Sequence, residues 1–252
     1  MNKSFRNTLA ILLASLCAVS ASASTSYFSE GHLSLEVMGF LDTSGNYYSF
    51  ANKPSDINLS YSDNALDEEY ITSITGDATA EAVSSPSSGV GQIDLYTSVT
   101  GDSNVAYALS TSDSTATGNF EFVNTSSTID YTVNLLLSYT FSNEVETDFP
   151  APLNNQLAST SIDMDVVGDF NLGQVLQLSE ETELSNANFN GSAKSKEIQL
   201  SFLLSAGDVE NVFASIINHG ESESISAVPL PASIFFFGPA LLTLVVRKKR
   251  PA

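Results

Sequence analysis

The feature that most constrains the fold is a regular alternation of apolar and polar residues between Thr128 and Phe141. Successive side chains of a β-strand point to opposite faces, so a period of two gathers the apolar ones on one face. A helix would scatter them around its axis. The segment therefore predicts a strand with one buried face and one wet face, whose buried face carries Ile129, Tyr131, Val133, Leu135, Leu137, Tyr139 and Phe141.

The same alternation recurs along the chain. It predicts further strands around Leu33–Val37, Gln92–Val99, Val105–Leu109, Ile162–Val166 and Ile198–Leu204. Clusters of Gly, Asn, Asp and Ser separate these segments, at Gly101–Asp102, Asn124–Ser127 and Ala206–Asp208. We expect the last cluster to turn a strand near Glu197–Ser205 back into another near Val209–Ile217. Of all segments, Val83–Gly91 has the composition most typical of a long loop.

These patterns predict an all-β domain of about eight to ten short strands: an antiparallel β-sandwich, jelly-roll-like or a related Greek key. The chain holds 40 Ser and 19 Thr, and charged residues make up only 15% of it. A chain of this kind is either disordered or β-structured, and the alternation favours β. We expect a Ser/Thr-rich surface and no internal repeat.

The N-terminus has the pattern of a secretory signal peptide. Lys3 and Arg6 precede an apolar run at Leu9–Val19, and the small-x-small pattern of Ala21 and Ala23 follows. We expect cleavage after Ala23, so that residues 1–23 are removed; the alternative is a first core helix. Cys17 lies in the run, so the mature chain would have no disulfide and no thiolate metal site.

The C-terminus carries an uncharged segment over residues 231–246, followed at once by Arg247, Lys248, Lys249 and Arg250. As a helix the segment would measure about 24 Å, slightly less than the ~30 Å hydrocarbon core. Four consecutive cations are typical of a stop-transfer signal retained on the cytoplasmic side. We therefore expect one C-terminal transmembrane helix; a terminal strand or core helix is the alternative.

Just before this segment stands the pentapeptide Val228, Pro229, Leu230, Pro231, Ala232. The pentapeptide, the hydrophobic span and the basic cluster, in that order, resemble the VPLPA variant of the PEP-CTERM sorting signal. Each proline favours an extended conformation in the residue before it, which suits a protease cleft.

The resemblance implies a Gram-negative bacterial protein processed by signal peptidase and by an exosortase. The tail would halt the chain transiently in the inner membrane, and the exosortase would cut near the pentapeptide. The domain would then pass to the cell surface or to an extracellular polysaccharide matrix.

The chain is therefore divided into a signal peptide (1–23), an exported domain (24–219), a spacer (220–227) and a sorting signal (228–252). Between the two ends, Lys53, Lys194 and Lys196 are the only cations, against all 29 acids, which gives a formal charge of −26. Nucleic-acid binding needs clustered Lys and Arg, so this composition excludes it. It also disfavours adsorption to an anionic membrane surface.

The chain has few residues that are typical of catalytic sites. His32 and His219 are the only histidines, and neither lies near a nucleophile motif. We expect no enzyme activity. A glycosidase with paired carboxylates stays open, because the 29 acids offer many pairs, but without Trp its sugar platform would have to come from the nine tyrosines.

Calcium is the one cofactor left open. Asp163, Asp165 and Asp169 place three carboxylates within seven residues, and carboxylate oxygens are the ligands that Ca²⁺ takes. The EF-hand pattern fails, because Val167 and Gln174 stand at ligand positions. The alternative is the wet face of a strand whose dry face is Ile162, Met164 and Val166. Asp67–Glu69 is a second acidic cluster of the same kind.

Together these features predict an exported surface or biofilm-matrix protein with a structural or interaction role, whose partners would be exopolysaccharide or other surface proteins. A calcium- or glycan-dependent adhesin is the alternative, because a β scaffold supports either function.

Overall fold

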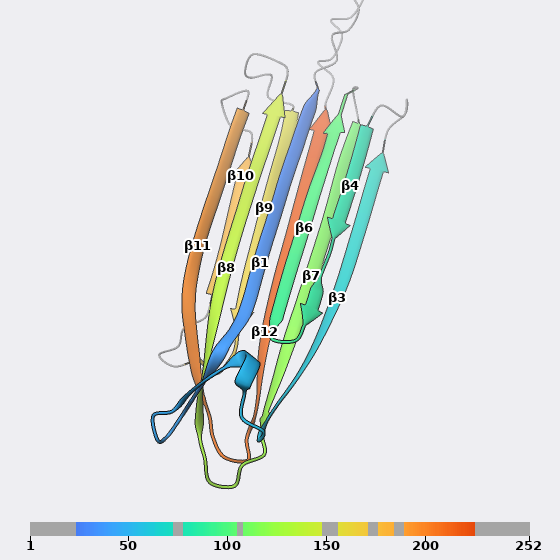
Figure 1. Cartoon of the computed structure of the whole chain (residues 1–252). Coiled ribbons are helices and arrows are strands. Elements are labelled where there is room, and N and C mark those ends of the chain that lie inside the picture. Colours follow the sequence, from blue (N-terminus) through green and yellow to red (C-terminus); the bar gives the residue numbers. More distant parts are fainter. Residues whose placement is uncertain are drawn as a thin grey trace, which may run out of the picture. The chain divides into compact units, whose positions relative to one another are not determined.

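Two antiparallel β-sheets form the domain in the computed structural model (Figure 1). The structure describes residues 24–72, 78–104, 108–147, 156–170, 176–183 and 189–224. All of them lie in one compact unit, Ala23–Ile225. The cores and sheets described below are internal to this unit, as is required of a domain that folds on its own.

The large sheet has seven strands. Five of them follow one another in the order β11-β8-β1-β6-β4, while β2 pairs with β1 and β5 with β6. Their bounds are β1 (Thr25–Asp42), β2 (Tyr47–Ser49), β4 (Ala78–Ser84), β5 (Ser87–Gly89), β6 (Gln92–Ser103), β8 (Tyr131–Thr147) and β11 (Phe189–Leu204).

The small sheet has five strands in the order β10-β9-β12-β7-β3. They are β3 (Ile57–Thr72), β7 (Ala108–Asn124), β9 (Gln156–Val167), β10 (Leu176–Glu183) and β12 (Val209–Ser224). A short 3-10 helix, Phe50–Asn52, precedes β3. Among the described strands every pairing is antiparallel.

The two sheets pack face to face. Side chains of β7 and β8 alternate between buried and partly exposed along the whole strand, because every second one points to the other sheet. A Cβ added to Gly31 of β1 would lie 2.8 Å from the Met164 side chain of β9. The rings of Phe122 and Phe202 meet edge to face across the sheets at 5.2 Å. This confirms the all-β, antiparallel, sandwich-like class that the sequence predicts.

One half of the interior is apolar. Its cluster includes the whole buried face that the alternation predicts for β8, from Tyr131 to Phe141. Ile129 packs against the same cluster from outside the strand, since β8 begins at Tyr131.

The other half of the interior is mainly polar, near the start of β1 and the end of β12. Hydrogen bonds join the sheets there: Ser103 Oγ donates to the Ser222 carbonyl at 2.9 Å, and Asn218 Nδ2 to the Ser29 carbonyl at 3.0 Å. Some of the Ser and Thr expected on the surface are therefore inside, at the buried positions Thr25, Ser29, Thr97, Ser103, Ser110, Ser112, Ser114, Thr160, Ser222 and Ser224.

The expectation of eight to ten short strands is wrong. The described residues form twelve strands, and β1 alone spans 18 residues. Gly101–Asp102, expected to separate strands, lies inside β6. Val83–Gly91, expected to be one long loop, contains the end of β4 and all of β5. Small and polar residues resemble turn residues in a sequence. In the structure Gly101 is buried against Tyr27, whereas Ser84 and Ser87–Gly89 are exposed or partly exposed strand residues at a sheet edge.

The turn expected at Ala206–Asp208 is present between two strands, as the sequence predicts, but these strands do not pair as a hairpin. The turn carries the chain from β11 in the large sheet to β12 in the small one. Asn124–Ser127 likewise leads from β7 to β8 in the other sheet. The Asn124 side chain links the two crossings, because its amide donates to the carbonyls of Ile129, Leu204 and Ser205.

The expected boundary at residue 219 is too early. β12 continues to Ser224, so residues 220–224 of the expected spacer belong to the small sheet. Ser222 and Ser224 are buried. The alternation of apolar and polar residues ends near Ile217, because the inward positions beyond it carry Asn218, Gly220, Ser222 and Ser224 instead of large apolar side chains.

Candidate functional site

The residues expected to direct sorting lie outside the described residues. These are Ala21 and Ala23, the pentapeptide Val228–Ala232 and the basic cluster Arg247–Arg250. Within the part of the chain that the structure describes, no helix is both long enough and apolar enough to span a membrane.

The candidate calcium ligands occupy the outer side of the small sheet. Asp163 and Asp165 alternate along β9 with Ile162, Met164 and Val166, which are fully buried. Asp169 follows the strand and is exposed. This is the alternative arrangement, the wet face of a strand whose dry face is apolar. Among the described residues no three His, Cys, Asp or Glu side chains are grouped closely enough to hold a metal ion.

In the second acidic cluster, Asp67 and Glu69 accept hydrogen bonds from the backbone of the other sheet. Glu69 Oε1 accepts the backbone N–H of Ala82 at 3.0 Å, and Asp67 Oδ2 accepts that of Ser84 at 3.1 Å. Asp63 Oδ2 accepts the N–H of Ser88 at 2.7 Å. We call Asp63, Asp67 and Glu69 the carboxylate clamp. It joins edge strand β3 of the small sheet to the outer edge of β4 and β5 in the large sheet.

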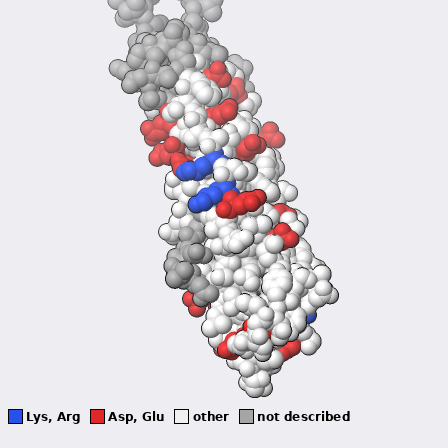
Figure 2. Space-filling model, turned by 60° about the vertical axis from the view of Figure 1, so that its left-hand side comes forward, with Lys and Arg blue, Asp and Glu red and all other residues white. Residues whose placement is uncertain are grey.

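On the opposite side of the sandwich, polar side-chain links join β10 to β11. Lys194 Nζ pairs with Glu180 Oε1 at 2.6 Å, and the hydroxyls of Thr182 and Ser192 are 3.1 Å apart. The hydrogen bond to Glu180 raises the pKa of Lys194. Lys196 makes no ion pair with any of the described residues. Figure 2, in which the β11 side of the domain comes forward, shows a small blue patch among red acidic side chains.

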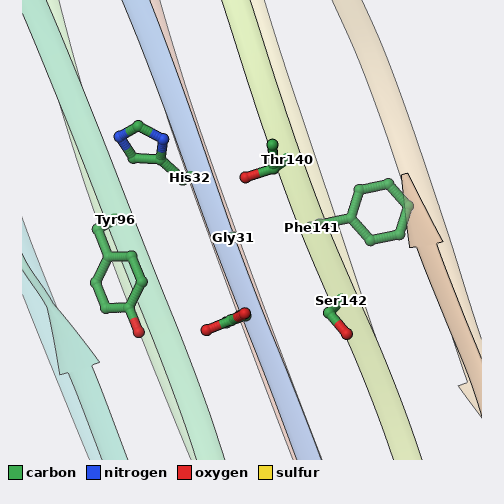
Figure 3. A pocket seen from close by; sticks show the side chains of 7 residues that line it. Gly31, His32, Tyr96, Thr140, Phe141 and Ser142 are labelled. Atoms are coloured by element: carbon green, nitrogen blue, oxygen red, sulfur yellow. The ribbon is translucent and has the colours of Figure 1, made fainter. Parts of the chain in front are cut away.

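The outer face of the large sheet holds a shallow depression of about 310 Å³. Figure 3 shows His32 on β1 and Tyr96 on β6, with Thr140 and Ser142 on β8 at the other side of β1. The Glu30 carboxylate and the inward positions Gly31 and Phe141 complete the lining. The depression combines an aromatic ring with hydroxyl groups and a carboxylate, so it can contact both the apolar and the polar faces of a small ligand.

The two histidines lie on different sheets. His32 Nε2 is 4.0 Å from Asp94 Oδ1 on the outside of the large sheet. His219 Nδ1 is 2.7 Å from Asp113 Oδ1, on the outside of the small sheet. No sequence motif marks the depression, because its residues Glu30, His32, Tyr96 and Thr140 come from three strands, and alternation alone does not predict which strands pair.

No protein-family model matches the chain, and no curated protein matches it. Among solved structures, the translocator domain of the autotransporter NalP from Neisseria meningitidis is 9% identical, with a TM-score of 0.14, over 87% of this chain and 95% of that one. An outer membrane channel from Pseudomonas putida F1 is 14% identical, with a TM-score of 0.13, over 81% and 97%. The C-terminal domain of the AgI/II polypeptide BspA from Streptococcus agalactiae has a TM-score of 0.10 at 10% identity, over 81% and 77%. Likenesses this weak carry no argument about this chain.

Proposed function

We propose that this chain is an exported bacterial surface or matrix protein with a structural or interaction role. Signal peptidase would remove residues 1–23, and an exosortase would process the tail at Val228–Ala232 after the segment 231–246 has halted in the inner membrane. The domain would then reach the cell surface or the exopolysaccharide matrix.

The observation that supports this proposal most is the fit between the folded domain and the two processing signals. β1 begins at Thr25, just after the expected cleavage at Ala23, and β12 ends at Ser224, just before Val228. Ser24 already takes part in the fold, since its carbonyl accepts the Thr147 hydroxyl at 3.0 Å. Removal of both ends would therefore leave every described strand complete.

The test is to express the full chain in a Gram-negative host that has an exosortase. We expect Pro229→Ala/Pro231→Ala to accumulate as a membrane-bound precursor, while the unchanged chain is released. Pro239→Ala, which lies in the apolar span, is the matched control and should be released as well. Equal release of the motif variant and the unchanged chain would contradict the proposal.

A glycan-binding role is the second candidate, and the depression favours it. Tyr96 offers a ring for stacking, and Thr140, Ser142 and Glu30 offer hydrogen-bonding groups to sugar hydroxyls. Tyr96→Ala should then abolish binding on a glycan array, and Phe213→Ala, which removes an exposed ring from the small sheet, should not. Repeating the array with EDTA would show whether calcium takes part. No binding by the unchanged protein excludes this role.

A further inference from the structure

The two sheets end in four edge strands, and these edges differ in charge and in access. β4 and β11 border the large sheet, and β3 and β10 border the small one. An edge strand presents unpaired backbone groups that can pair with another chain. The question is which of these edges remain open to a partner.

Two of the edges are poor pairing sites. Along β4 and β5 the N–H groups of Ala82, Ser84 and Ser88 already donate to the carboxylate clamp. β10 has only eight residues and carries three carboxylates, Glu180, Glu181 and Glu183.

The β3 edge is long, acidic and partly apolar. It spans 16 residues and carries Asp63, Asp67, Glu68 and Glu69. Leu66 is 56% exposed and Tyr70 60%. Two copies of β3 placed side by side would bring carboxylates against carboxylates, so this edge is protected against pairing with itself.

The β11 edge is complementary to it. It also spans 16 residues and carries two of the three cations in a domain with 29 acids. Lys194 pairs with Glu180 of β10, so Lys196, which makes no ion pair with any described residue, is the cation left for a partner. Among the described strands β11 pairs only with β8. Phe189 and Leu203 give it exposed apolar groups near both ends.

From this we infer that β11 of one copy docks on β3 of a second copy, the pair of edges whose length and charge match. The two edges are different surfaces of the same domain, so the contact is heterologous and leaves a free β3 and a free β11 at the ends of the assembly. Assembly therefore continues beyond the dimer, into open chains unless the rotation between copies closes a ring. The inference stands on the domain alone and does not depend on export or tail processing.

The first test measures the mass of residues 24–225 against concentration by sedimentation, near 0.15 M salt, where charges more than about 8 Å apart are largely screened. We expect a mass that rises beyond the dimer. Lys196→Glu, which breaks no described ion pair, should require about tenfold more protein for the same mass. The matched control Asn211→Asp/Gln177→Glu changes the net charge equally, at exposed sites on β12 and β10, and should behave like the parent.

The second test locates the contact. Residues 24–225 contain no cysteine, so single cysteines can be introduced cleanly. Ser195→Cys on β11 mixed with Asn64→Cys on β3 should give a crosslinked heterodimer with a short bis-maleimide. Ser195→Cys mixed with Asn211→Cys should give little. A folded, monomeric domain at every concentration, or equal crosslinking in both mixtures, would overturn the inference.

Discussion

At the scale of single residues, Tyr27 shows how the polar half of the interior is packed. It is the largest side chain there, and its hydroxyl lies 2.8 Å from Ser112 Oγ and 3.2 Å from Ser110 Oγ. Burial raises the pKa of this phenol. Its ring occupies the space left by Gly101 and Gly220, which face it from opposite sheets. The Tyr27 ring thus requires glycine at both positions. In the sequence, however, these glycines resemble the ends of strands.

Gly220→Ala should destabilise the domain. The added methyl group would overlap the Tyr27 ring, and overpacking of this kind costs about 1–3 kcal/mol. Gly89→Ala is the matched control, because a Cβ there meets nothing within 4 Å. Denaturant unfolding measures both variants. A Gly220→Ala domain as stable as the control would show that Tyr27 is not packed in this way.

Glu210 gives a prediction about pH. Desolvation, together with the nearby charges of Asp169 and Asp208, raises the pKa of this carboxyl in the folded domain. The folded state then binds the proton more tightly than the unfolded state, so stability falls as pH rises through the window between the two pKa values. Glu210→Gln should therefore melt at a higher temperature than the parent at pH 7. The difference should disappear below about pH 4.

At the scale of elements, the sequence predicts which face of a strand is buried better than it predicts which strands pair. A period of two identifies the buried side of β8 and of β9 because large apolar residues alternate there with polar ones. Along the first half of β7 the inward side chains are Ser110, Ser112 and Ser114. The outward side chains there are mostly Thr and Asp, which are also polar, so the sequence shows no alternation in hydrophobicity. The turn after β11 resembles a hairpin turn, and its crossing to the other sheet depends on contacts far apart in the chain, such as those of Asn124.

The contribution of the carboxylate clamp to the contact between β3 and β4 can be tested by mutation. Asp67→Ala/Glu69→Ala removes the acceptors of the Ala82 and Ser84 amides, which should cost about 1–2 kcal/mol. Both amides should exchange with solvent at least about tenfold faster in native-state hydrogen exchange. Glu68→Ala is the matched control, since Glu68 lies between the two acids and points to the other face. Unchanged exchange in the double variant would show that the clamp does not protect this edge.

At the scale of the whole molecule, the charge distribution and the domain limits agree with each other. The cations outside residues 24–226 lie in the two segments proposed to be removed, and the acids lie in the part proposed to be exported. The start of β1 and the end of β12 meet across the sheets, through Thr25 beside Ser103 and the hydrogen bond from Ser103 to Ser222. The sequence predicts the two processing signals from local motifs alone. The sheet edges and the depression depend on which strands pair, and local sequence motifs do not predict that pairing.

The most direct test of the central claim is mass spectrometry of the terminal peptides of the protein recovered from the cell surface or matrix. We expect an N-terminal peptide that begins at Ser24, a C-terminus within residues 228–232, and no peptide from Arg247–Arg250. Surface-exposed protein that still carries the Arg247–Arg250 cluster would contradict it.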